Sequence, residues 1–339
     1  MGAPAPRTIP VFVVVPPRVL LLDVAGPVEV LRKANLEQDI VRFDVRFVGP
    51  ARKLGSSIGL DVTGIAALPA RLPEGSMVLV PGHAEFPLGE PVTTAAQNDA
   101  YEARIVEWLR GVMRPGIRLA TICSGAMLAG RAGLLDGFEC TTHHACTAEL
   151  ATAVPAARVR ENRLYVVDGE RMTSAGITAG IDLMLHVVAT EVGPACALAV
   201  ARFLVVYLRR AGGDPQLSPW LEGRNHVHPS IHRAQDAVAG DPARGWSVES
   251  LARVAASSPR NLSRLFNEHA GMSVTDYVNR MRIALARELL NGSRLDVETV
   301  AERAGFASAR QLRRAWGRLN KLPPSRARMS LSSAGEPLS

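Results

Sequence analysis

The sequence predicts an α/β domain built on a doubly wound, mostly parallel sheet, followed by an all-α domain with two helix-turn-helix units. Three observations predict this fold class. The chain has 339 residues, enough for two domains that each bury a core. Short apolar runs alternate with helical patterns through its first two thirds, and a helical segment in its last third occurs twice.

The chain divides into four segments. We expect the α/β domain at 1–210, a linker that begins with turn-forming residues at 211–228, the helical domain at 229–329 and a flexible tail at 330–339. Apolar residues make up 47% of the chain, so both domains are expected to be folded.

Five short apolar runs are expected to form the sheet, and four segments with helical spacing are expected to cover both of its faces. In such folds, ligands bind beyond the carboxyl ends of the strands. The expected strands are residues 11–15, 43–48, 77–80, 119–122 and 164–167, and the expected helices are residues 28–35, 101–113, 125–135 and 176–190.

The sequence also predicts where the protein works. No apolar stretch reaches the roughly 18 residues that a membrane span needs, and no secretion signal is evident. We therefore expect a cytoplasmic protein with no membrane contact. The cysteines form no CxxC pair, so they are expected to be thiols rather than disulfides.

The net charge of +7 lies almost entirely in the C-terminal part of the chain. Residues 1–213 carry 21 basic and 20 acidic side chains, whereas residues 214–339 carry 18 basic and 12 acidic ones. A solvated basic surface would have the same composition. A basic excess confined to one domain is also typical of proteins that bind the phosphate backbone of nucleic acids.

The helical domain contains an internal repeat. VESLA at 248–252 matches VETVA at 297–301, and RNL at 260–262 matches RQL at 310–312. Each copy predicts a short helix, a tight turn and a second helix, and a long amphipathic helix at 275–290 is expected to join the copies. The expected N-caps of the short helices are Ser247, Ser258, Asp296 and Ser308.

The second helix of each copy has one apolar face and one polar, largely basic face. Arg, Asn, Gln and Ser side chains reach the base edges and phosphates of DNA, so we predict two recognition helices that enter successive major grooves. A helical bundle with a basic solvent face is the alternative, which the repeat and its caps disfavour. The apolar faces comprise Leu262, Leu265 and Phe266 in the first copy and Leu312, Ala315, Trp316 and Leu319 in the second; the expected DNA-binding residues are Arg260, Asn261, Ser263, Arg264, Asn267, Arg310, Gln311, Arg313 and Arg314.

Residues 246–328 resemble the DNA-binding domain of AraC/XylS regulators over its full length. The resemblance implies a transcription regulator that binds specific DNA sequences. The positions that carry it are Gly271, Arg282-Ile283, Ala286-Arg287, Leu289-Leu290 and Ala304-Gly305-Phe306.

The end of the helical domain departs from the AraC/XylS pattern. Asn320-Lys321 replaces the usual Phe-Gly, and Ala327 replaces a tyrosine, although Pro324 and Arg328 fit. We therefore expect a different local turn after the second recognition helix.

A cysteine elbow marks the α/β domain. Residues 120–126 read ATICSGA, which predicts a strand, a cysteine in a cramped turn and a helix start. This arrangement places Cys123 under a helix N-terminus, which predicts a depressed thiol pKa, and places the Ser124 amide where it can bind an oxyanion. A small buried cysteine would give the same pattern.

The first domain, to about residue 209, resembles the DJ-1/PfpI (class I glutamine amidotransferase-like) superfamily, which implies a flavodoxin-like doubly wound parallel sheet. By that resemblance Asp23 is the acid beside the cysteine, and His143 is a candidate third member of the site. In fusions with AraC-type domains, this domain generally looks like a ligand-sensing and dimerisation module. The stretches that carry the resemblance are LDxxGPxE at 22–29, the elbow with AGLLDG at 132–137, TTH at 141–143 and TSAGITAGID at 173–182.

One loop departs from the enzymes of that superfamily. They commonly carry Pro-Gly-Gly at the oxyanion loop, whereas this chain has Pro81-Gly82-His83. We therefore expect a sensor and not an enzyme, with no catalytic residues. The alternatives are a cysteine enzyme of amidase or isocyanide-hydratase type, and a redox sensor that responds to oxidation of Cys123.

A group of potential metal ligands follows the elbow. Cys140, His143, His144 and Cys146 lie within seven residues and offer soft ligands. Their spacing matches no standard zinc loop, so neither a metal nor a cofactor is expected.

These patterns together predict a homodimeric regulator whose partners are double-stranded DNA and a small-molecule effector. We expect the effector to bias how the C-terminal domains sit on DNA. It is expected to bind near six residues of the α/β domain, which are Asp23, Gly82, His83, Cys123, Ser124 and His143.

Overall fold

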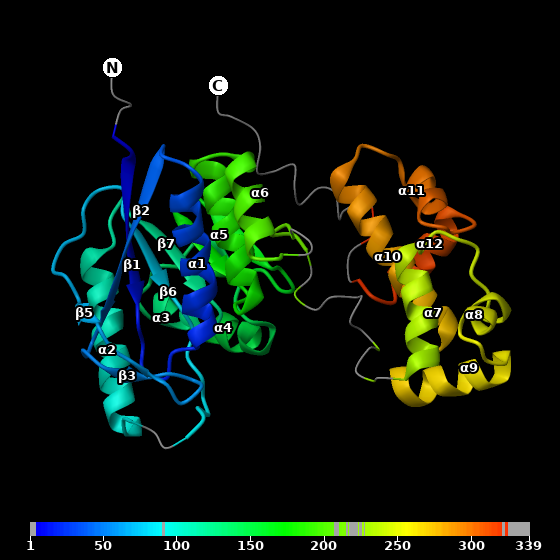
Figure 1. Cartoon of the computed structure of the whole chain (residues 1–339), viewed down its shortest axis with the longest axis horizontal. Coiled ribbons are helices and arrows are strands. Elements are labelled where there is room, and N and C mark those ends of the chain that lie inside the picture. Colours follow the sequence, from blue (N-terminus) through cyan, green and yellow to red (C-terminus); the bar gives the residue numbers. More distant parts are fainter. Residues whose placement is uncertain are drawn as a thin grey trace. The chain divides into compact units, whose positions relative to one another are not determined.

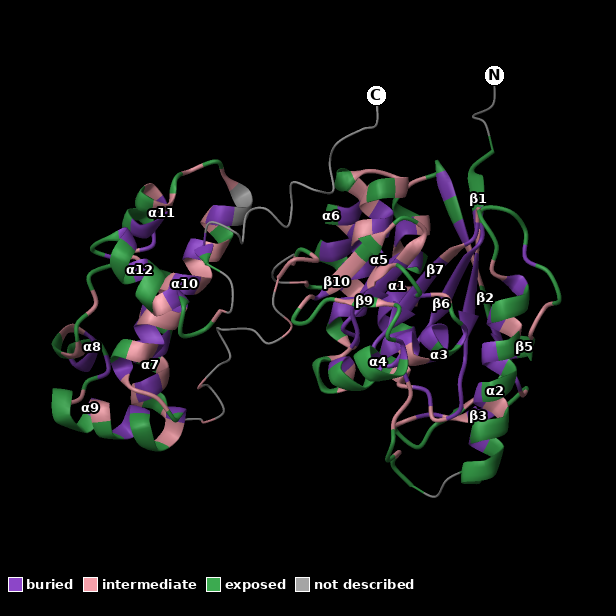
Figure 2. Cartoon of the chain, turned by 180° about the vertical axis from the view of Figure 1, so that it is seen from behind, coloured by how far each residue is buried: buried purple, intermediate pink, exposed green. Residues whose placement is uncertain are grey.

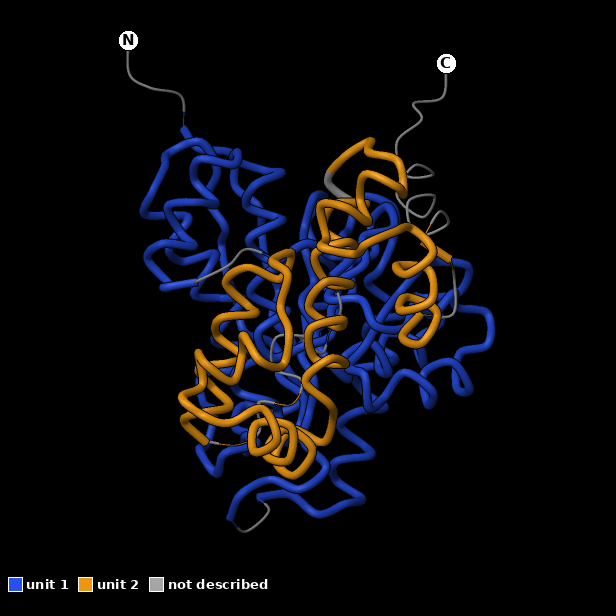
Figure 3. The backbone as a smooth tube through the Cα atoms, turned by 90° about the vertical axis from the view of Figure 1, so that its right-hand side faces the viewer, with its two compact units in different colours: residues 1–216 blue, residues 217–339 orange. Residues whose placement is uncertain are grey.

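The computed structural model describes residues 5–89, 92–206, 210–214, 216, 223, 226, 228–320 and 323–324. The chain forms two compact units, residues 1–216 and residues 217–339 (Figure 3). The expected tail at 330–339 and much of the expected linker lie outside the described residues.

The predicted doubly wound sheet is confirmed in the first unit (Figure 1). Over the described residues, the order of its seven strands is β10 (Tyr165–Asp168), β11 (Arg171–Ser174), β7 (Arg118–Ile122), β6 (Met77–Val80), β1 (Arg7–Val14), β2 (Val41–Gly49) and β5 (Ala66–Ala67). Strands β10 and β11 are antiparallel, and the other neighbours are parallel. Two short pairs accompany this sheet, β3 (Leu54–Gly55) with β4 (Asp61–Val62) and β8 (Glu139–Cys140) with β9 (Arg158–Val159).

The central strands are apolar because both faces of the sheet are buried (Figure 2). In β1, Val11 and Val13 pack in one hydrophobic core, whereas Phe12 and Val14 pack in the other, since successive side chains of a strand point to opposite faces. Helices α1 (Leu21–Glu37), α5 (Thr178–Glu191) and α6 (Pro194–Phe203) build the first core, and α2 (Ala95–Val112), α3 (Gly125–Arg131) and α4 (Thr147–Ala153) build the second.

The first unit differs from the sequence prediction in its number of elements and in the start of one helix. Helix α6, strand β11 and the short strands β3, β4, β5, β8 and β9 are additional to the predicted elements. Helix α1 begins at Leu21, before the predicted start at residue 28, and carries Pro27 in its interior. Gly26 is a packing residue of this helix, because a Cβ there would lie 2.9 Å from the Ile181 side chain of α5.

The second unit contains two small hydrophobic cores, one for each copy of the repeat. Helix α10 (Val274–Gly292) contributes to both, with Tyr277 and Met281 in the first core and Ile283 and Leu290 in the second. At 1.5 Å per residue it spans roughly 28 Å. The helix therefore joins two helix-turn-helix units, as predicted. The remaining helices are α7 (Pro229–Gly240), α8 (Val248–Val254), α9 (Pro259–Leu265), α11 (Val297–Arg303) and α12 (Ala309–Trp316).

The four predicted N-caps of the repeat are confirmed. Each cap satisfies an amide that the first turn of a helix leaves without an intrahelical acceptor. The side-chain oxygens of Ser247, Ser258, Asp296 and Ser308 accept hydrogen bonds from the amide three residues on, at 3.1, 3.2, 2.7 and 3.2 Å.

The predicted apolar faces of α9 and α12 are buried, or partly buried at Ala315, with one exception. Leu319 is 43% exposed, so the prediction that it points inward is wrong. Helix α12 ends at Trp316, and the next turn tightens, with the Leu319 amide donating to Trp316 O at 3.0 Å. Asn320 then binds back to the helix end, because its Nδ2 donates to the same carbonyl at 3.2 Å.

Candidate ligand pocket and DNA interface

Cys123 lies at the carboxyl end of β7, directly before the turn into α3. Its backbone is left-handed, with a φ of 55°, which costs a non-glycine residue roughly 1–2 kcal/mol. Two glycines leave room for this elbow: a Cβ on Gly176 would lie 2.2 Å from Cys123 Cβ, and one on Gly125 would lie 2.0 Å from Val80 O. Strain of this kind concentrates at functional sites.

Asp23 of α1 is fully buried beside Cys123. Its carboxylate accepts backbone hydrogen bonds from Ile177 at 2.7 Å and from Gly82 at 3.2 Å, and it also bonds to the Cys123 side chain. Burial outweighs these bonds and raises the pKa of Asp23 to about 6. The carboxylate therefore ties the Gly82 loop to the cysteine elbow.

The prediction of a depressed thiol pKa is wrong. Burial, followed by the charge of Asp23, raises the pKa of Cys123 to about 12. The Ser124 amide donates to the sulfur and lowers the pKa, but by less than burial raises it. Helix α3 is only seven residues long, and its dipole does not offset the desolvation. Cys123 is therefore a neutral thiol at pH 7.

The predicted pocket residues around the elbow are connected. The His83 amide donates to Ser124 Oγ at 3.1 Å, and the Gly82 amide donates to Asp23. A Cβ on Gly82 would lie within 3.0 Å of Asp23, Cys123 and Ser124, so this position requires glycine. The amides of the predicted oxyanion loop thus already have acceptors.

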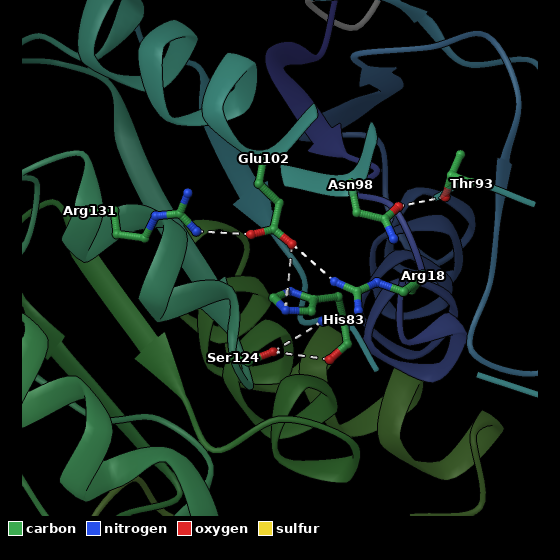
Figure 4. Close-up of polar contacts among 7 residues, drawn as sticks. All are labelled: Arg18, His83, Thr93, Asn98, Glu102, Ser124 and Arg131. Carbon is green, nitrogen blue, oxygen red and sulfur yellow. Dashed lines mark hydrogen bonds and ion pairs between the residues drawn. The ribbon is translucent and has the colours of Figure 1, made fainter. Parts of the chain in front are cut away.

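A charged cluster that the sequence did not predict adjoins this loop (Figure 4). Glu102 of α2 is 7% exposed and pairs with Arg131 at 2.9 Å and with Arg18 at 3.3 Å. Nε2 of His83 lies 3.8 Å from the same carboxylate. Burial lowers the pKa of His83, so its ring is neutral at pH 7. Its Nδ1 is buried with no hydrogen-bond partner in the described part of the chain.

His143 lies where β8 leads into the helical turn His144–Cys146. Its Nδ1 accepts the Ala145 amide at 3.3 Å, and its ring packs against His144. The neighbouring Thr142 contacts the elbow, because its Oγ1 donates to the Cys123 carbonyl at 2.8 Å. The role of His143 as a third member of the site stays a prediction.

Residues 210–214 and 216, which we call the strap, are bound to the first unit. Arg210 forms an ion pair with the buried Asp182. The Leu164 amide donates to Gly212 O at 3.1 Å. At the end of the strap, Gln216 Nε2 donates to Thr142 O at 2.8 Å. The last residue of the strap, Gln216, therefore binds Thr142, the residue whose hydroxyl group donates to the Cys123 carbonyl.

Three general features bear on the site. All four cysteines are free thiols. Across the described ranges, no group of three or more His, Cys, Asp or Glu side chains is arranged to hold a metal ion. No helix among these residues is long and apolar enough to cross a membrane.

Helix α9 and the helical turn Phe266–Ala270 expose the first predicted DNA-binding face. Its long polar side chains are exposed, and Ser263 is half-buried. Arg264 donates to Glu268 Oε2 and, at 3.1 Å, to Asn261 Oδ1. Asn267 Nδ2 donates to Ser263 O at 2.9 Å. The first face is therefore polar but partly neutralised within the helix.

Helix α12 exposes the second predicted face, and Arg310, Gln311, Arg313 and Arg314 all lie in solvent. Arg313 pairs with Glu298 of α11 at 3.1 Å. Within the described residues, Arg310 and Arg314 have no ion pair. The α12 face therefore has more positive charge without a carboxylate partner than the α9 face has.

Two family models cover both units. Residues 10–190 match the model described as the DJ-1/PfpI family, and residues 251–330 match a helix-turn-helix domain. The chain belongs to the DJ-1/PfpI family. It is 31% identical over 312 residues to the HTH-type transcriptional regulator GlxA of Rhizobium meliloti, covering 91% of this chain and 92% of that one.

Two regulators of Pseudomonas aeruginosa are also similar to this DJ-1/PfpI protein. CdhR is 31% identical over 316 residues, which cover 92% of this chain and 89% of CdhR. GbdR is 28% identical over 320 residues, which cover 94% of this chain and 82% of GbdR. Among solved structures, an AraC family transcriptional regulator from Pseudomonas putida aligns with a TM-score of 0.45 and 22% identity, covering 58% of this chain and 99% of that one.

The DJ-1/PfpI domain is thus joined to an AraC-type helix-turn-helix domain, and the protein is a DNA-binding transcription regulator. This result confirms the function that the repeat and its basic faces predict.

Proposed function

We propose that this DJ-1/PfpI-type regulator binds a small-molecule effector beside Cys123, does no chemistry on it, and responds by changing its affinity for DNA. The observation that carries the proposal is the state of the cysteine, a buried thiol with a pKa of about 12. Catalysis by cysteine needs the thiolate and open donors for an oxyanion. Here the thiol is neutral, and the amides of Gly82 and His83 are already bonded.

The DNA contacts are proposed to come from both recognition helices. Their exposed side chains are of the types that read base edges and bind phosphates. Helix α10, roughly 28 Å long by its rise per residue, is close to the roughly 34 Å between successive major grooves on one face of DNA. The proposed contacts are Arg260, Asn261, Ser263, Arg264 and Asn267 of the first helix and Arg310, Gln311, Arg313 and Arg314 of the second.

We further propose that the strap carries the signal between effector and DNA. Two hydrogen bonds link Cys123 O to Thr142 Oγ1 and Thr142 O to Gln216 Nε2. An effector that shifts the Cys123 elbow would move Thr142 and so weaken or strengthen its hydrogen bond with Gln216. Gln216 is the last residue of the first unit. A ligand moves such an equilibrium only by its differential affinity for the held and released states.

A homodimer is the proposed active form, because dimeric regulators read paired half-sites with matching two-fold symmetry. Each copy would contribute two recognition helices to its half-site. We also propose that the protein works in the cytoplasm, which its DNA-binding domain supports.

The test uses the full chain and a duplex selected from random sequence by that chain. Compounds that raise its unfolding midpoint are identified first, and DNA affinity is then measured with and without them by fluorescence anisotropy. We expect a stabilising compound to change DNA affinity, and we expect Cys123→Ser to keep this response within a few fold. Cys196→Ser, at a half-buried cysteine of α6, is the matched control.

Two outcomes would overturn the proposal in favour of its alternatives. Multiple turnover of a small amide, nitrile or isocyanide that is lost in Cys123→Ser would establish an enzyme. A DNA response to peroxide that is lost in Cys123→Ser and kept in Cys196→Ser would establish a redox sensor.

A further inference from the structure

A pocket opens beside Arg18 in the first unit. Its cavity volume is about 70 Å³, within a wider hollow of about 430 Å³ that includes open solvent. Ser56 and Thr93 supply hydroxyl groups to its wall, and Leu88 and Val92 supply apolar surface. Leu88 is 68% exposed and Val92 is 55% exposed. The wall of the pocket therefore offers both hydroxyl groups and aliphatic side chains to a ligand.

The backbone of Arg18 is fixed at this pocket. It is left-handed, with a φ of 56°, a conformation that persists only where the surroundings impose it. The Arg18 carbonyl accepts the Ala84 amide at 2.9 Å, and the next residue, Val19, bridges to both Ser56 and His83. The backbone of Arg18 is therefore fixed between the pocket wall and the loop at 82–84, which contacts the Cys123 elbow.

The guanidinium of Arg18 is incompletely satisfied. A guanidinium offers five N–H donors. In the described part of the chain, the Arg18 side chain makes one hydrogen bond, the 3.3 Å contact with Glu102, and its Nε is buried without a partner. Its side chain is only 23% exposed, which strengthens its interaction with an added anion.

The charges around Glu102 do not balance. One carboxylate faces two guanidiniums, Arg18 and Arg131, and His83 is neutral because burial lowers its pKa. Glu149 adds a second negative charge near His83. Arg18, however, shares its carboxylate with Arg131 and is therefore only partly neutralised. An anionic group in the pocket would complete this neutralisation and accept from the open donors of Arg18.

We propose that this pocket is the anion subsite of the effector site and that it takes a small aliphatic monocarboxylate. The carboxylate pairs with Arg18, and the aliphatic part lies against Leu88 and Val92. The inference rests on the proposed function, since it names the chemical class of the effector. His83 connects the subsite to the elbow, because its side chain faces Glu102 and its amide binds Ser124.

The test titrates the full chain with acetate, butyrate and hexanoate and with the primary amide of each acid, by calorimetry and by thermal shift. The acids should bind more tightly than their amides, and affinity should rise with chain length because each buried methylene contributes. Arg18→Gln should weaken binding of the acids about ten- to a hundredfold and leave the weak binding of the amides unchanged.

Two variants serve as controls. Arg18→Lys keeps the positive charge and should retain most of the affinity for the acids. Arg42→Gln removes an exposed arginine of β2 that does not line this pocket, and this variant should bind the acids like the wild type. Circular dichroism of each variant checks that it is folded. Equal binding of acids and amides, or wild-type binding of the acids by Arg18→Gln, would overturn the subsite.

The outcomes separate this inference from the proposed function. Carboxylate binding that depends on Arg18 but leaves DNA affinity unchanged would support the subsite and refute effector control. A neutral or cationic compound that changes DNA affinity and binds Arg18→Gln like the wild type would support effector control and refute the subsite.

Discussion

Two carboxylates on the second unit compete with DNA for arginines of the recognition helices. Glu268 binds Arg264, and Glu298 binds Arg313 at 3.1 Å. We predict that Glu268→Gln and Glu298→Gln each strengthen DNA binding, because each releases one guanidinium for phosphates or bases and removes one negative charge near the phosphate backbone.

The size of the effect follows from the exposure of these pairs. The Glu268 side chain is 53% exposed and that of Glu298 is 67% exposed. An exposed ion pair contributes about 0.2–1 kcal/mol, and 1.4 kcal/mol corresponds to a factor of ten. Release of either arginine should therefore raise DNA affinity by up to about fivefold at low salt, and the gain should shrink at high salt because the charges are screened.

The assay is fluorescence anisotropy of the full chain on its selected duplex over a range of salt concentrations. Glu302→Gln, an exposed acid of α11 with no ion pair among the described residues, is the control for loss of charge alone. Its gain should be smaller than that of Glu268→Gln. In an Arg264→Ala background the gain from Glu268→Gln should fall to that of the control. An undiminished gain there, or weaker DNA binding in Glu268→Gln, would refute our assignment of the first recognition face.

Three further predictions concern the first unit. Gln216→Ala removes the 2.8 Å bond to Thr142 and should reduce the effector's influence on DNA affinity by up to about 1 kcal/mol, with effector binding unchanged; an unaltered response in a titration of both ligands would remove the strap from the signal path. Iodoacetamide labelling of Cys123, followed by peptide mapping, should stay slow and should rise about tenfold per pH unit up to pH 9 without levelling off, because its pKa is about 12 and only the thiolate reacts; a labelling rate that reaches a plateau below pH 9 would contradict the assignment of a neutral thiol. Asp23 has its pKa raised from 3.8 to about 6, so its contribution to stability is fully present below pH 3.8 and is lost as the pH rises through 6. Relative to Asp23→Asn, the wild type should lose about 3 kcal/mol of unfolding free energy between about pH 3 and about pH 7, and urea titrations that give a constant difference would show that Asp23 is not buried as described.

Local patterns predicted the second unit well. Each N-cap depends on one side chain and the amide three residues on, so Ser258 and Asp296 could be identified without tertiary information. The buried faces followed from helical periodicity as long as the helix continued. The prediction failed at Leu319, because the end of α12 depends on a tightened turn that its periodicity does not show.

The site could be predicted only in part. Asp23 and Cys123 stood out through the resemblance and the elbow pattern, but the depth of their burial, which sets both pKa values, depends on the packed domain. The cluster on Glu102 had no signal, because Arg18, Glu102 and Arg131 lie far apart in the sequence and each reads as an ordinary surface residue. Only the packing of α2 beside the Cys123 elbow brings them together.

The most direct test of the central claim is hydroxyl-radical and methylation-interference footprinting of the full chain on its selected duplex. If both helix-turn-helix units read DNA, each half-site should show two protected major-groove segments about one helical turn apart, roughly 34 Å. Combined substitution of Arg310 and Arg314 by alanine should abolish protection of one segment and leave the other. A single protected segment that is unaffected by these changes, or the absence of any preferred duplex, would contradict the claim.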